Sequence, residues 1–291
     1  MTSLPRHKNT LGERAVLITG CSSGIGLCVA RGLHQRGYFV IASARKADDV
    51  TRLQDEGLTA IQLDLTEPDS IQAAVDKTLK LTNGRLFALF NNGAYGQPGA
   101  VEDLSRAVLR QQFETNLFGT VELTNLVIPT FRKQGYGRII QNSSMLGIVT
   151  LPYRGAYNAS KFALEGITDT LRQELTGTGI FVSLIEPGPI ESRFRANAFA
   201  AYRQHIDATS SAHRDTYLKM ERRLQKPGPA APFTLPPEAV LKQVIQALES
   251  RRPKPRYYVT FPTHLFGILR RLLSTRWLDK ILLKVSGDEN K

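Results

Sequence analysis

The sequence predicts an α/β protein built on a doubly wound parallel sheet and followed by a C-terminal helical extension. From Ala15 to Gly188, short apolar runs alternate with longer segments of helical period, which is the pattern of repeated βαβ units. A glycine-rich turn, T-G-C-S-S-G-I-G, joins the first apolar run to the first helical segment. Beyond Pro187 the alternation ends, and the last part of the chain is helical and amphipathic. We therefore expect a single domain, residues 1–291, with additions after its core.

Six strands are expected in the dinucleotide-binding core, residues 13–188. They are residues 15–19, 39–44, 60–63, 86–90, 137–141 and 181–185. Each is a short apolar run bounded by turn residues, and the segments between them carry apolar residues at helical spacing. Parallel strands need crossover connections, so these segments are expected to be helices that pack on the sheet.

The composition of the chain changes after the core. Residues 189–235 have few apolar runs and contain the stretch K-P-G-P-A-A-P-F, which indicates helices interrupted by loop. Such a segment could be a lid over a site or a plain surface insertion. Residues 236–291 are expected to form a final helix and strand and then the amphipathic extension.

The extension allows two interpretations. Its apolar residues recur at helical intervals, with Trp277 near the middle and arginines and lysines between them. One or two amphipathic helices could pack on the domain or on a second subunit, or they could rest on an anionic membrane surface. The pattern leaves both open. The apolar residues are Leu265, Ile268, Leu269, Leu272, Leu273, Leu278, Ile281 and Leu282.

The glycine-rich turn has the features of a dinucleotide-binding loop. Gly20, Gly24 and Gly26 would let the backbone turn tightly and approach a pyrophosphate, and the following helix offers free N–H groups and the positive end of its dipole. The spacing G-x-x-x-G-x-G differs from the G-x-G-x-x-G fingerprint, so the loop alone could also be an ordinary strand-to-helix turn. The residues between the glycines that we expect at the cofactor are Ser22, Ser23 and Ile25.

The end of the second predicted strand bears on which cofactor is used. An acidic residue there would accept hydrogen bonds from a free ribose hydroxyl, but the sequence reads A-S-A-R-K, with Arg45 and Lys46 at the strand end. Arg45 can bind a 2′-phosphate as a forked donor, which favours NADP(H) over NAD(H). The alternative is that both are ordinary surface residues of a basic protein.

Tyr157, Lys161 and Ser144 are the strongest candidates for catalysis. The tyrosine and lysine lie four residues apart in Y-N-A-S-K, so both would project from one face of a helix, and the serine lies thirteen residues before the tyrosine. An unperturbed tyrosine titrates near pH ~10, and we expect the nearby cation to lower that pKa. Tyr157 could then exchange a proton while a cofactor transfers a hydride. Any one of the three could be structural, but together, behind a dinucleotide loop, they indicate an active site.

Charge and cysteine content narrow the possible partners and compartment. A formal charge of +12 attracts nucleic acid, anionic lipid and phosphorylated cofactors alike. The chain has no nucleic-acid recognition motif and no aromatic-basic platform, so we expect no nucleic-acid partner. Cys21 and Cys28 match neither a zinc spacing nor a redox pair, so we expect no metal site and a reducing, cytoplasmic location. Residues 1–10 lack the apolar stretch of a secretion signal, and no apolar run is long enough to span a bilayer.

From residue 13 to residue 192 the sequence resembles the short-chain dehydrogenase/reductases, in the single-domain branch with the T-G-x-x-x-G-x-G loop. It has the D-L-T of that family at Asp64, an N-x-x-G at Asn116 and the P-G at Pro187 and Gly188, together with the serine, tyrosine and lysine above. The family's N-N-A-G is inverted here to N-N-G-A at Asn91, which keeps small residues at both positions. The resemblance implies a Rossmann-like fold and an NADP(H)-dependent oxidoreductase.

The same resemblance implies a role for each matching residue. Asp64 and the Leu65 amide would contact the adenine, Asn91 would brace the cofactor-side strand, and Gly93 would let the backbone pass close to the cofactor. Ser192, where the family commonly has threonine, would bond the nicotinamide carboxamide, and Asn116 would hold a backbone kink and a water linked to Lys161. The remaining residues that the likeness places at the cofactor are Pro187, Gly188 and Ile190.

Apolar residues between Ser144 and Tyr157 indicate an apolar substrate. Leu146, Tyr153 and Phe194 are our candidates for substrate contact, although such residues could equally be core. The branch most similar to the chain includes hydroxysteroid, retinol and long-chain aldehyde reductases, which implies an apolar aldehyde or ketone. The alternative is a catalytically silent NADP(H)-binding regulatory protein. The family likeness also implies a homo-oligomer, with residues 105–135 and 156–177 as candidate interfaces.

Overall fold

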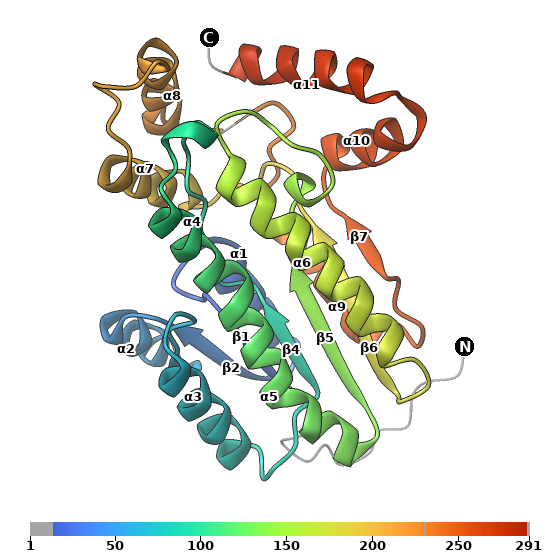
Figure 1. Ribbon diagram of the computed structural model, residues 1–291. Helices are drawn as coiled ribbons and strands as arrows, with labels where there is room; N and C mark the ends of the chain where they lie inside the picture. Colours follow the sequence, from blue (N-terminus) through green and yellow to red (C-terminus); the bar gives the residue numbers. More distant parts are fainter. Residues whose placement is uncertain (1–13, 230, 290–291) are drawn as a thin grey trace.

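A seven-stranded parallel sheet forms the centre of the computed structural model, which describes residues 14–229 and 231–289 (Figure 1). The order of the strands is β3-β2-β1-β4-β5-β6-β7. Their bounds are β1 Ala15–Ile18, β2 Phe39–Ala44, β3 Thr59–Gln62, β4 Ala88–Asn91, β5 Gly137–Asn142, β6 Ile180–Glu186 and β7 Arg256–Tyr258. The first six lie within two residues of the predicted strands at either end. The predicted fold class is thus confirmed, with β7 as the expected final strand.

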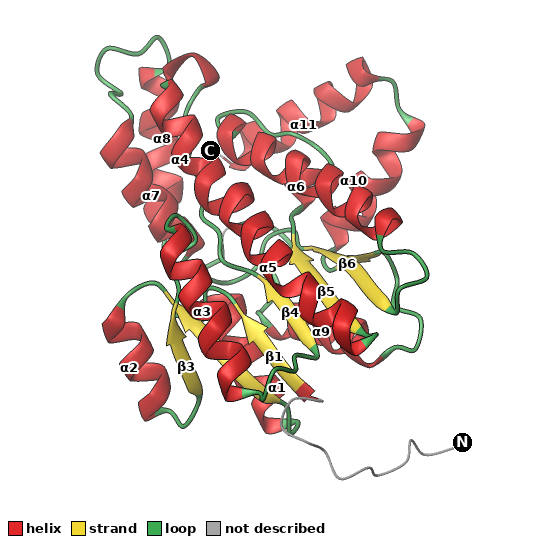
Figure 2. Ribbon diagram, turned by 60° about the horizontal axis from the view of Figure 1, so that its bottom comes forward, coloured by secondary structure: helices red, strands yellow, loops and turns green. Residues whose placement is uncertain are grey.

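Helices cover both faces of the sheet (Figure 2). One face packs against α1 Gly24–Gln35, α2 Ala47–Asp55 and α9 Glu238–Glu249. The other packs against α3 Pro68–Leu81, α5 Gly119–Gln134 and α6 Gly155–Glu174. All four residues of β1, A-V-L-I, are fully buried, because the strand is covered from both sides.

The order of the strands locates the opening of the fold. The chain moves from β1 to β2 and β3 on one side and then crosses to β4, which pairs with the other edge of β1. At such a switch point the loops after the two central strands diverge and leave a crevice at their carboxyl ends. The short helix α4 Arg106–Phe113 and a π-helical turn, Glu114–Phe118, lead from this end of β4 into α5.

Four of the helices that follow β6 gather at the same end of the sheet (Figure 1). They comprise α7 Phe194–His205, α8 Arg214–Gln225, α10 Phe261–Leu272 and α11 Thr275–Glu289. Phe266 of α10 and Leu282 of α11 are buried against Met145 and Val149, in the segment that follows β5. The predicted extension therefore packs on the domain through one face. None of the helices within residues 14–229 and 231–289 combines the length and the apolar content needed to cross a bilayer. Residues 1–10, for which we expect no secretion signal, lie outside the described residues.

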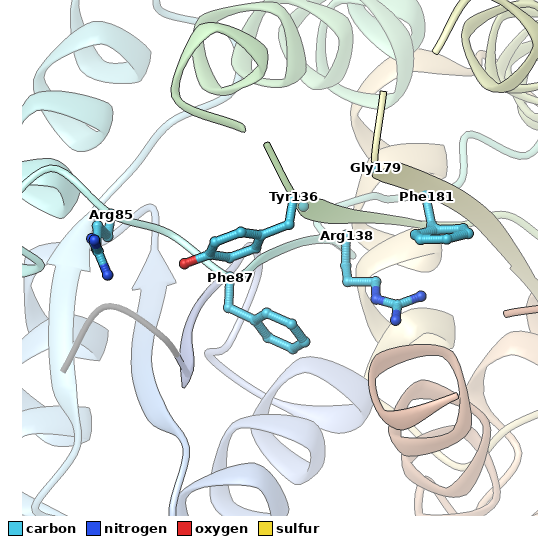
Figure 3. A pocket seen from close by; sticks show the side chains of 7 residues that line it. Arg85, Phe87, Tyr136, Arg138, Gly179 and Phe181 are labelled. Carbon is cyan, nitrogen blue, oxygen red and sulfur yellow. The ribbon is translucent and has the colours of Figure 1, made fainter. Parts of the chain in front are cut away.

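The opposite end of the sheet has a small hollow of about 350 Å³ (Figure 3). Its walls come from the amino ends of β4, β5 and β6 and include Phe87, Tyr136 and Phe181. The Arg138 guanidinium lies 4.6 Å from the centre of the Phe181 ring and donates a hydrogen bond to the Ser250 carbonyl at 2.7 Å. Cofactors bind open parallel sheets at the carboxyl ends of the strands. This hollow lies at the amino ends, so it is not where a cofactor is expected.

Candidate active site

A cavity of about 680 Å³ opens at the carboxyl ends of the central strands. Its walls come from the glycine loop after β1, from residues 92–98 after β4, from the segment after β5, from α6, and from residues 187–198 after β6. Most of the predicted site residues meet there although they are far apart in the sequence. Those that line it are Gly20, Ser22, Ser23, Gly24, Ile25, Gly93, Ser144, Leu146, Tyr157, Lys161, Pro187, Gly188, Ile190, Ser192 and Phe194.

The glycine loop leaves no room for side chains at two of its positions. Gly20 has φ +70°, and a Cβ there would lie 2.8 Å from the Cα of Gly93. A Cβ at Gly26 would lie 2.3 Å from the Gly20 carbonyl oxygen. The loop is held to the next strand by the Cys21 N–H, which donates to the Ser43 carbonyl at 2.7 Å. Gly24 and Ile25 of the first turn of α1 line the cavity, and this turn carries no acidic residue that would repel an anion from the helix N-terminus.

Asn92 and Thr19 hold the loop after β4 beside the glycine loop. The Thr19 hydroxyl accepts hydrogen bonds from the N–H groups of Asn92 at 2.8 Å and Gly93 at 2.7 Å. The Asn92 amide donates to the Thr19 carbonyl at 3.0 Å, and its oxygen accepts from the Asn142 amide at 2.9 Å. Sequence reasoning overlooked Asn92, although the doubled asparagine of N-N-G-A was a signal that could have identified it.

Tyr157 lies at the centre of the cavity wall, on the first turn of α6. Its ring meets the ring of Phe194 edge to face, with centroids 5.3 Å apart. Its hydroxyl is hydrogen-bonded to the side chain of Ser144. The Ser144 oxygen also accepts from the N–H of Leu146 at 3.1 Å, so one of its lone pairs is used.

Lys161 lies one helical turn beyond Tyr157 and faces the same cavity, as the spacing predicted. Its ammonium nitrogen is 5.8 Å from the centre of the Tyr157 ring and donates to the Asn142 carbonyl at 2.7 Å. The side chain is only 3% exposed. Burial lowers the pKa of Lys161 to about 8, partly opposed by the negative charge of Glu165.

The expected effect of Lys161 on the pKa of Tyr157 is not present. Burial raises the pKa of Tyr157 to about 12, and the influences that lower it are the hydrogen bond with Ser144 and the charge of Arg154. The reason is that the phenol is enclosed by protein and a phenolate would lose its hydration there. The nearby lysine is itself desolvated, which limits how strongly it holds its charge. Tyr157 is consequently protonated at neutral pH.

Asn116 is buried behind the cavity wall in the π-helical turn between α4 and α5. Its amide nitrogen donates to the Tyr95 carbonyl at 3.0 Å and to the Ser160 hydroxyl at 3.1 Å, and its oxygen accepts from the Tyr95 N–H at 3.2 Å. Asn116 thus ties the loop after β4 to the residue before Lys161. A π turn of this kind is the backbone irregularity that the family likeness implied at this position.

Six predicted cofactor residues do not line the cavity. Arg45 and Lys46 are exposed where β2 passes into α2. One Asp64 oxygen accepts from the backbone N–H of Thr66 at 3.0 Å and from its hydroxyl at 2.9 Å. Asn91 is buried and donates to the Thr124 hydroxyl at 2.9 Å, which ties β4 to α5. The other two are Gly26 and Leu65.

Tyr153 requires a correction, because it does not line the cavity. It adopts φ +60°, a conformation that is rare for an aromatic residue, and its ring turns towards α8. There its hydroxyl is hydrogen-bonded to Nδ1 of His213 at 3.2 Å and its ring contacts the edge of Tyr217. Met145 and Leu151 do line the cavity, so the apolar wall exists without Tyr153.

A buried acidic cluster lies behind the cofactor side of the cavity and was not anticipated. Arg256 of β7 contacts Glu165 of α6 and Glu186 of β6, each at 3.1 Å, and Asp169 of α6 at 2.6 Å. Burial raises the pKa of Glu186 to about 9, and the neighbouring carboxylate of Glu165 adds to the rise. Glu186 is therefore protonated at neutral pH, in the position directly before Pro187.

Comparison with known proteins agrees with this geometry. The protein-family model described as "short chain dehydrogenase" matches residues 14–203 of this chain. The chain is 44% identical over 270 residues to the uncharacterized oxidoreductase YbbO of Escherichia coli (strain K12), covering 93% of this chain and 94% of that one. It is 32% identical over 287 residues to retinol dehydrogenase 8 of Bos taurus, covering 93% and 85%. A short-chain dehydrogenase structure from Streptomyces avermitilis superimposes with a TM-score of 0.72 at 25% identity, covering 92% and 93%.

Proposed function

Because the chain belongs to the short chain dehydrogenase family of oxidoreductases, we propose that it transfers a hydride between NADP(H) and an apolar aldehyde or ketone. The observation that carries the proposal is that Tyr157, Ser144 and Lys161 face the same cavity as the glycine loop. Long-chain aldehydes, retinoids and steroid-like ketones are the substrates we propose.

The cavity fits a dinucleotide on its glycine-loop side. Side chains at Gly20 and Gly26 would clash with the backbone of Gly93 and of Gly20 itself, so the tight course of the loop beside the cavity depends on these glycines. Ser22, Ser23 and Ile25 line the cavity at the start of α1, where backbone N–H groups and the helix dipole favour a negatively charged group. Residues 187–192 face them from the other side of the opening.

When bound there, the nicotinamide supplies the hydride in the reductive direction. Ser144 and Tyr157 then donate hydrogen bonds to the carbonyl oxygen of the substrate and stabilise the negative charge that develops on it. Tyr157 is protonated at neutral pH because burial raises its pKa to about 12, so it enters the reaction in the form that an acid needs. Lys161 uses one N–H on the Asn142 carbonyl and has two left for ribose hydroxyls.

The choice of NADP(H) is supported by the end of β2. Residues 44–46 are alanine, arginine and lysine, so no carboxylate is present there to repel a 2′-phosphate. Arg45 and Lys46 are both exposed and can move towards such a phosphate.

The choice of an apolar substrate is supported by the opposite wall. Met145, Leu146 and Leu151 pack in one cluster with Tyr157, and Phe194 contacts its ring, so this wall offers apolar contacts to a substrate. The relative named retinol dehydrogenase supports the same class, since retinol is an apolar alcohol.

The test is to follow NADPH oxidation with a panel of fatty aldehydes, retinal, steroid ketones and small polar ketones. We expect turnover of the apolar carbonyls and little or none of the polar ones. Tyr157→Phe should lower turnover by about 10²- to 10⁴-fold, the usual contribution of a positioned acid, while NADPH binding measured by fluorescence is retained. An active Tyr157→Phe variant would contradict the assigned acid. NADPH binding without turnover of any carbonyl would instead indicate a silent regulatory protein.

A further inference from the structure

The outer face of α10 carries an apolar stripe. Phe261, Leu265, Ile268 and Leu272 follow one another at intervals of four, three and four residues and therefore lie on one side of the helix. They are 57%, 37%, 56% and 75% exposed. Surface helices normally present polar residues to solvent, so a row of four large apolar side chains on the outside calls for a partner.

The inner face of the same helix is already used. Phe266 is 4% exposed and packs with Met145 and Leu282, and the Arg270 guanidinium donates to the Ile148 carbonyl and lies 5.0 Å from the centre of the Phe162 ring. These contacts fix α10 on the domain without any help from the outer stripe. The stripe is consequently not explained by the folding of this chain.

The stripe extends onto the segment between β6 and α9. Phe233 is 60% exposed, and its ring lies 5.1 Å from that of Phe261. It adopts φ +62°, a strained conformation for a bulky side chain, and the strain is tolerated in a position that presents the ring to solvent. We call Phe233, Phe261, Leu265, Ile268 and Leu272 the α10 patch.

The helix α11, which lies at the same end of the molecule as α10, carries positive charge (Figure 1). Residues 261–289, which span α10 and α11, contain five arginines and lysines and three acidic residues, which are Asp279 and, at the end of α11, Asp288 and Glu289. Arg276, Lys280 and Lys284 repeat at intervals of four along the exposed side of α11. Trp277, 60% exposed, lies beside them with the Lys280 ammonium 4.6 Å from the centre of its ring.

From this arrangement we infer that α10 and α11 dock in the plane of an anionic membrane surface. The α10 patch enters the boundary between headgroups and acyl chains, and the basic side chains of α11 pair with lipid phosphates. Tryptophan and long basic side chains suit this boundary because each has an apolar body and a polar end. A second copy of this chain would bring the same basic row of Arg276, Lys280 and Lys284, so charge complementarity favours the anionic lipid.

The position of the two helices links docking to the cavity. Their inner faces cover Met145, Leu146 and Leu151, which also form the apolar wall beside Tyr157. If the proposed function holds, a lipophilic carbonyl dissolved in the membrane reaches the cavity over this wall. Docking itself does not depend on the identity of the substrate.

The experiment is co-sedimentation of the full-length protein with vesicles of phosphatidylcholine alone or mixed with phosphatidylglycerol, at low and at physiological salt. We expect binding to the mixed vesicles, weakened by salt, and little binding to phosphatidylcholine alone. Ile268→Ser combined with Leu272→Ser should weaken binding about tenfold or more, because two exposed apolar anchors are lost. Lys280→Glu combined with Lys284→Glu should weaken binding to the mixed vesicles by a similar factor.

Val101→Ser is the matched control, because Val101 is 71% exposed, close to the 75% of Leu272, and lies before α4, outside the α10 patch. It should leave vesicle binding unchanged. Thermal melting and NADPH binding should be the same in all variants, which separates a docking defect from misfolding. Failure of the wild type to bind mixed vesicles at low salt would overturn the inference. So would dimers, seen by sedimentation, that Ile268→Ser with Leu272→Ser disrupts while vesicle binding stays intact.

Discussion

The glycine-loop side of the cavity and its Tyr157 side are held by different kinds of contact. On the glycine-loop side, backbone groups bond directly to other backbone groups or to short side chains, as between Cys21 and Ser43 and between Gly93 and Thr19. On the Tyr157 side, helices contact one another through aromatic and aliphatic side chains. An example is the contact between the rings of Phe194 of α7 and Tyr157 of α6. Directed backbone bonds leave little freedom of shape, whereas apolar contacts permit repacking.

This difference suits a site that binds the same cofactor in every reaction but whose substrate can differ between related proteins. A cofactor has a fixed shape and fixed charges, so a rigid loop with preset N–H groups serves it well. The segments after β6 that line the cavity lie outside the sheet, so their residues can change without disturbing it. Mutations on the two sides should therefore have different consequences for cofactor binding and for substrate use.

The largest effect is expected from adding a side chain to the glycine loop. In Gly26→Ala the new Cβ would lie 2.3 Å from the Gly20 oxygen and 2.7 Å from the Asn92 amide nitrogen, so the loop backbone must move. We expect NADPH affinity, measured by fluorescence titration, to fall about 100-fold or more. Gly166→Ala is the matched control: it lies on α6 with open space around it and should raise stability by up to about 1 kcal/mol without affecting NADPH. Equal NADPH affinity in both variants would show that the loop is not rigid.

A smaller effect on the same side is expected from the end of β2. Arg45→Asp replaces a cation by a group that repels a 2′-phosphate and accepts from a ribose hydroxyl. The ratio of kcat/KM for NADPH to that for NADH should fall about 10- to 100-fold, since a hydrogen bond to a charged group contributes about 1.5–3 kcal/mol. Arg252→Asp makes the same charge change at an exposed position in the loop leading to β7 and should leave the ratio unchanged. An unaltered ratio in Arg45→Asp would remove Arg45 from cofactor selection.

Each side of the cavity is predictable from the sequence to the extent that its contacts join residues close together in the chain. The six core strands and the glycine loop were predicted because their signals are local: β-branched runs, and glycines at positions such as Gly20 where φ is positive. The four-residue spacing of Tyr157 and Lys161 likewise sets their common face through helix geometry alone. The pKa of Tyr157 was predicted wrongly because burial depends on the packing of the whole fold.

The Tyr157 side depends on contacts that no local pattern reveals. Tyr153 was assigned to the cavity by its neighbours in sequence, but its partner, His213, lies 60 residues further along the chain. Arg256 joins Glu165 and Glu186 across three separate elements, so the acidic cluster has no motif. For α10 the periodicity predicts an amphipathic helix, but it does not indicate which residues are buried. Packing against Met145 determines which face of α10 is buried and which is exposed.

A moderate effect confined to the substrate side is expected from Phe194→Ala. Losing the ring that packs edge to face with Tyr157 should raise KM for an apolar carbonyl roughly tenfold and leave NADPH affinity almost unchanged. Phe181→Ala is a close control, since Phe181 is 38% exposed where Phe194 is 37%, but it lies at the opposite end of the sheet. Steady-state kinetics with both ligands would decide the matter. A loss of NADPH affinity equal to the rise in KM would mean that the two sides are not independent.

The smallest effect is expected outside the cavity, at Glu186 directly before Pro187, and it appears in the pH dependence of stability. The pKa of Glu186 is about 9 in the folded protein against 4.5 for a free side chain, so between these values the folded state holds a proton that the unfolded state has released. Stability must therefore decrease as pH rises through that window, by at most about 1.4 kcal/mol per pH unit for this group. Glu186→Gln keeps a neutral donor beside Glu165 and should flatten the slope.

Denaturant unfolding at several values between about pH 5.5 and pH 8 would measure that slope below the range in which Lys161 contributes. The lowered pKa of Lys161 acts in the opposite sense, because its folded state gives up a proton first and stability rises with pH above about 8. Glu165 and Arg256 remain in place in Glu186→Gln, so the difference between the two slopes belongs to Glu186 and to its influence on Glu165. Glu174→Gln, at an exposed position on the same helix as Glu165, should reproduce the wild-type slope. Parallel slopes for wild type and Glu186→Gln would mean that Arg256 holds Glu186 as a carboxylate, and the strand before Pro187 would then carry a negative charge behind the cofactor side.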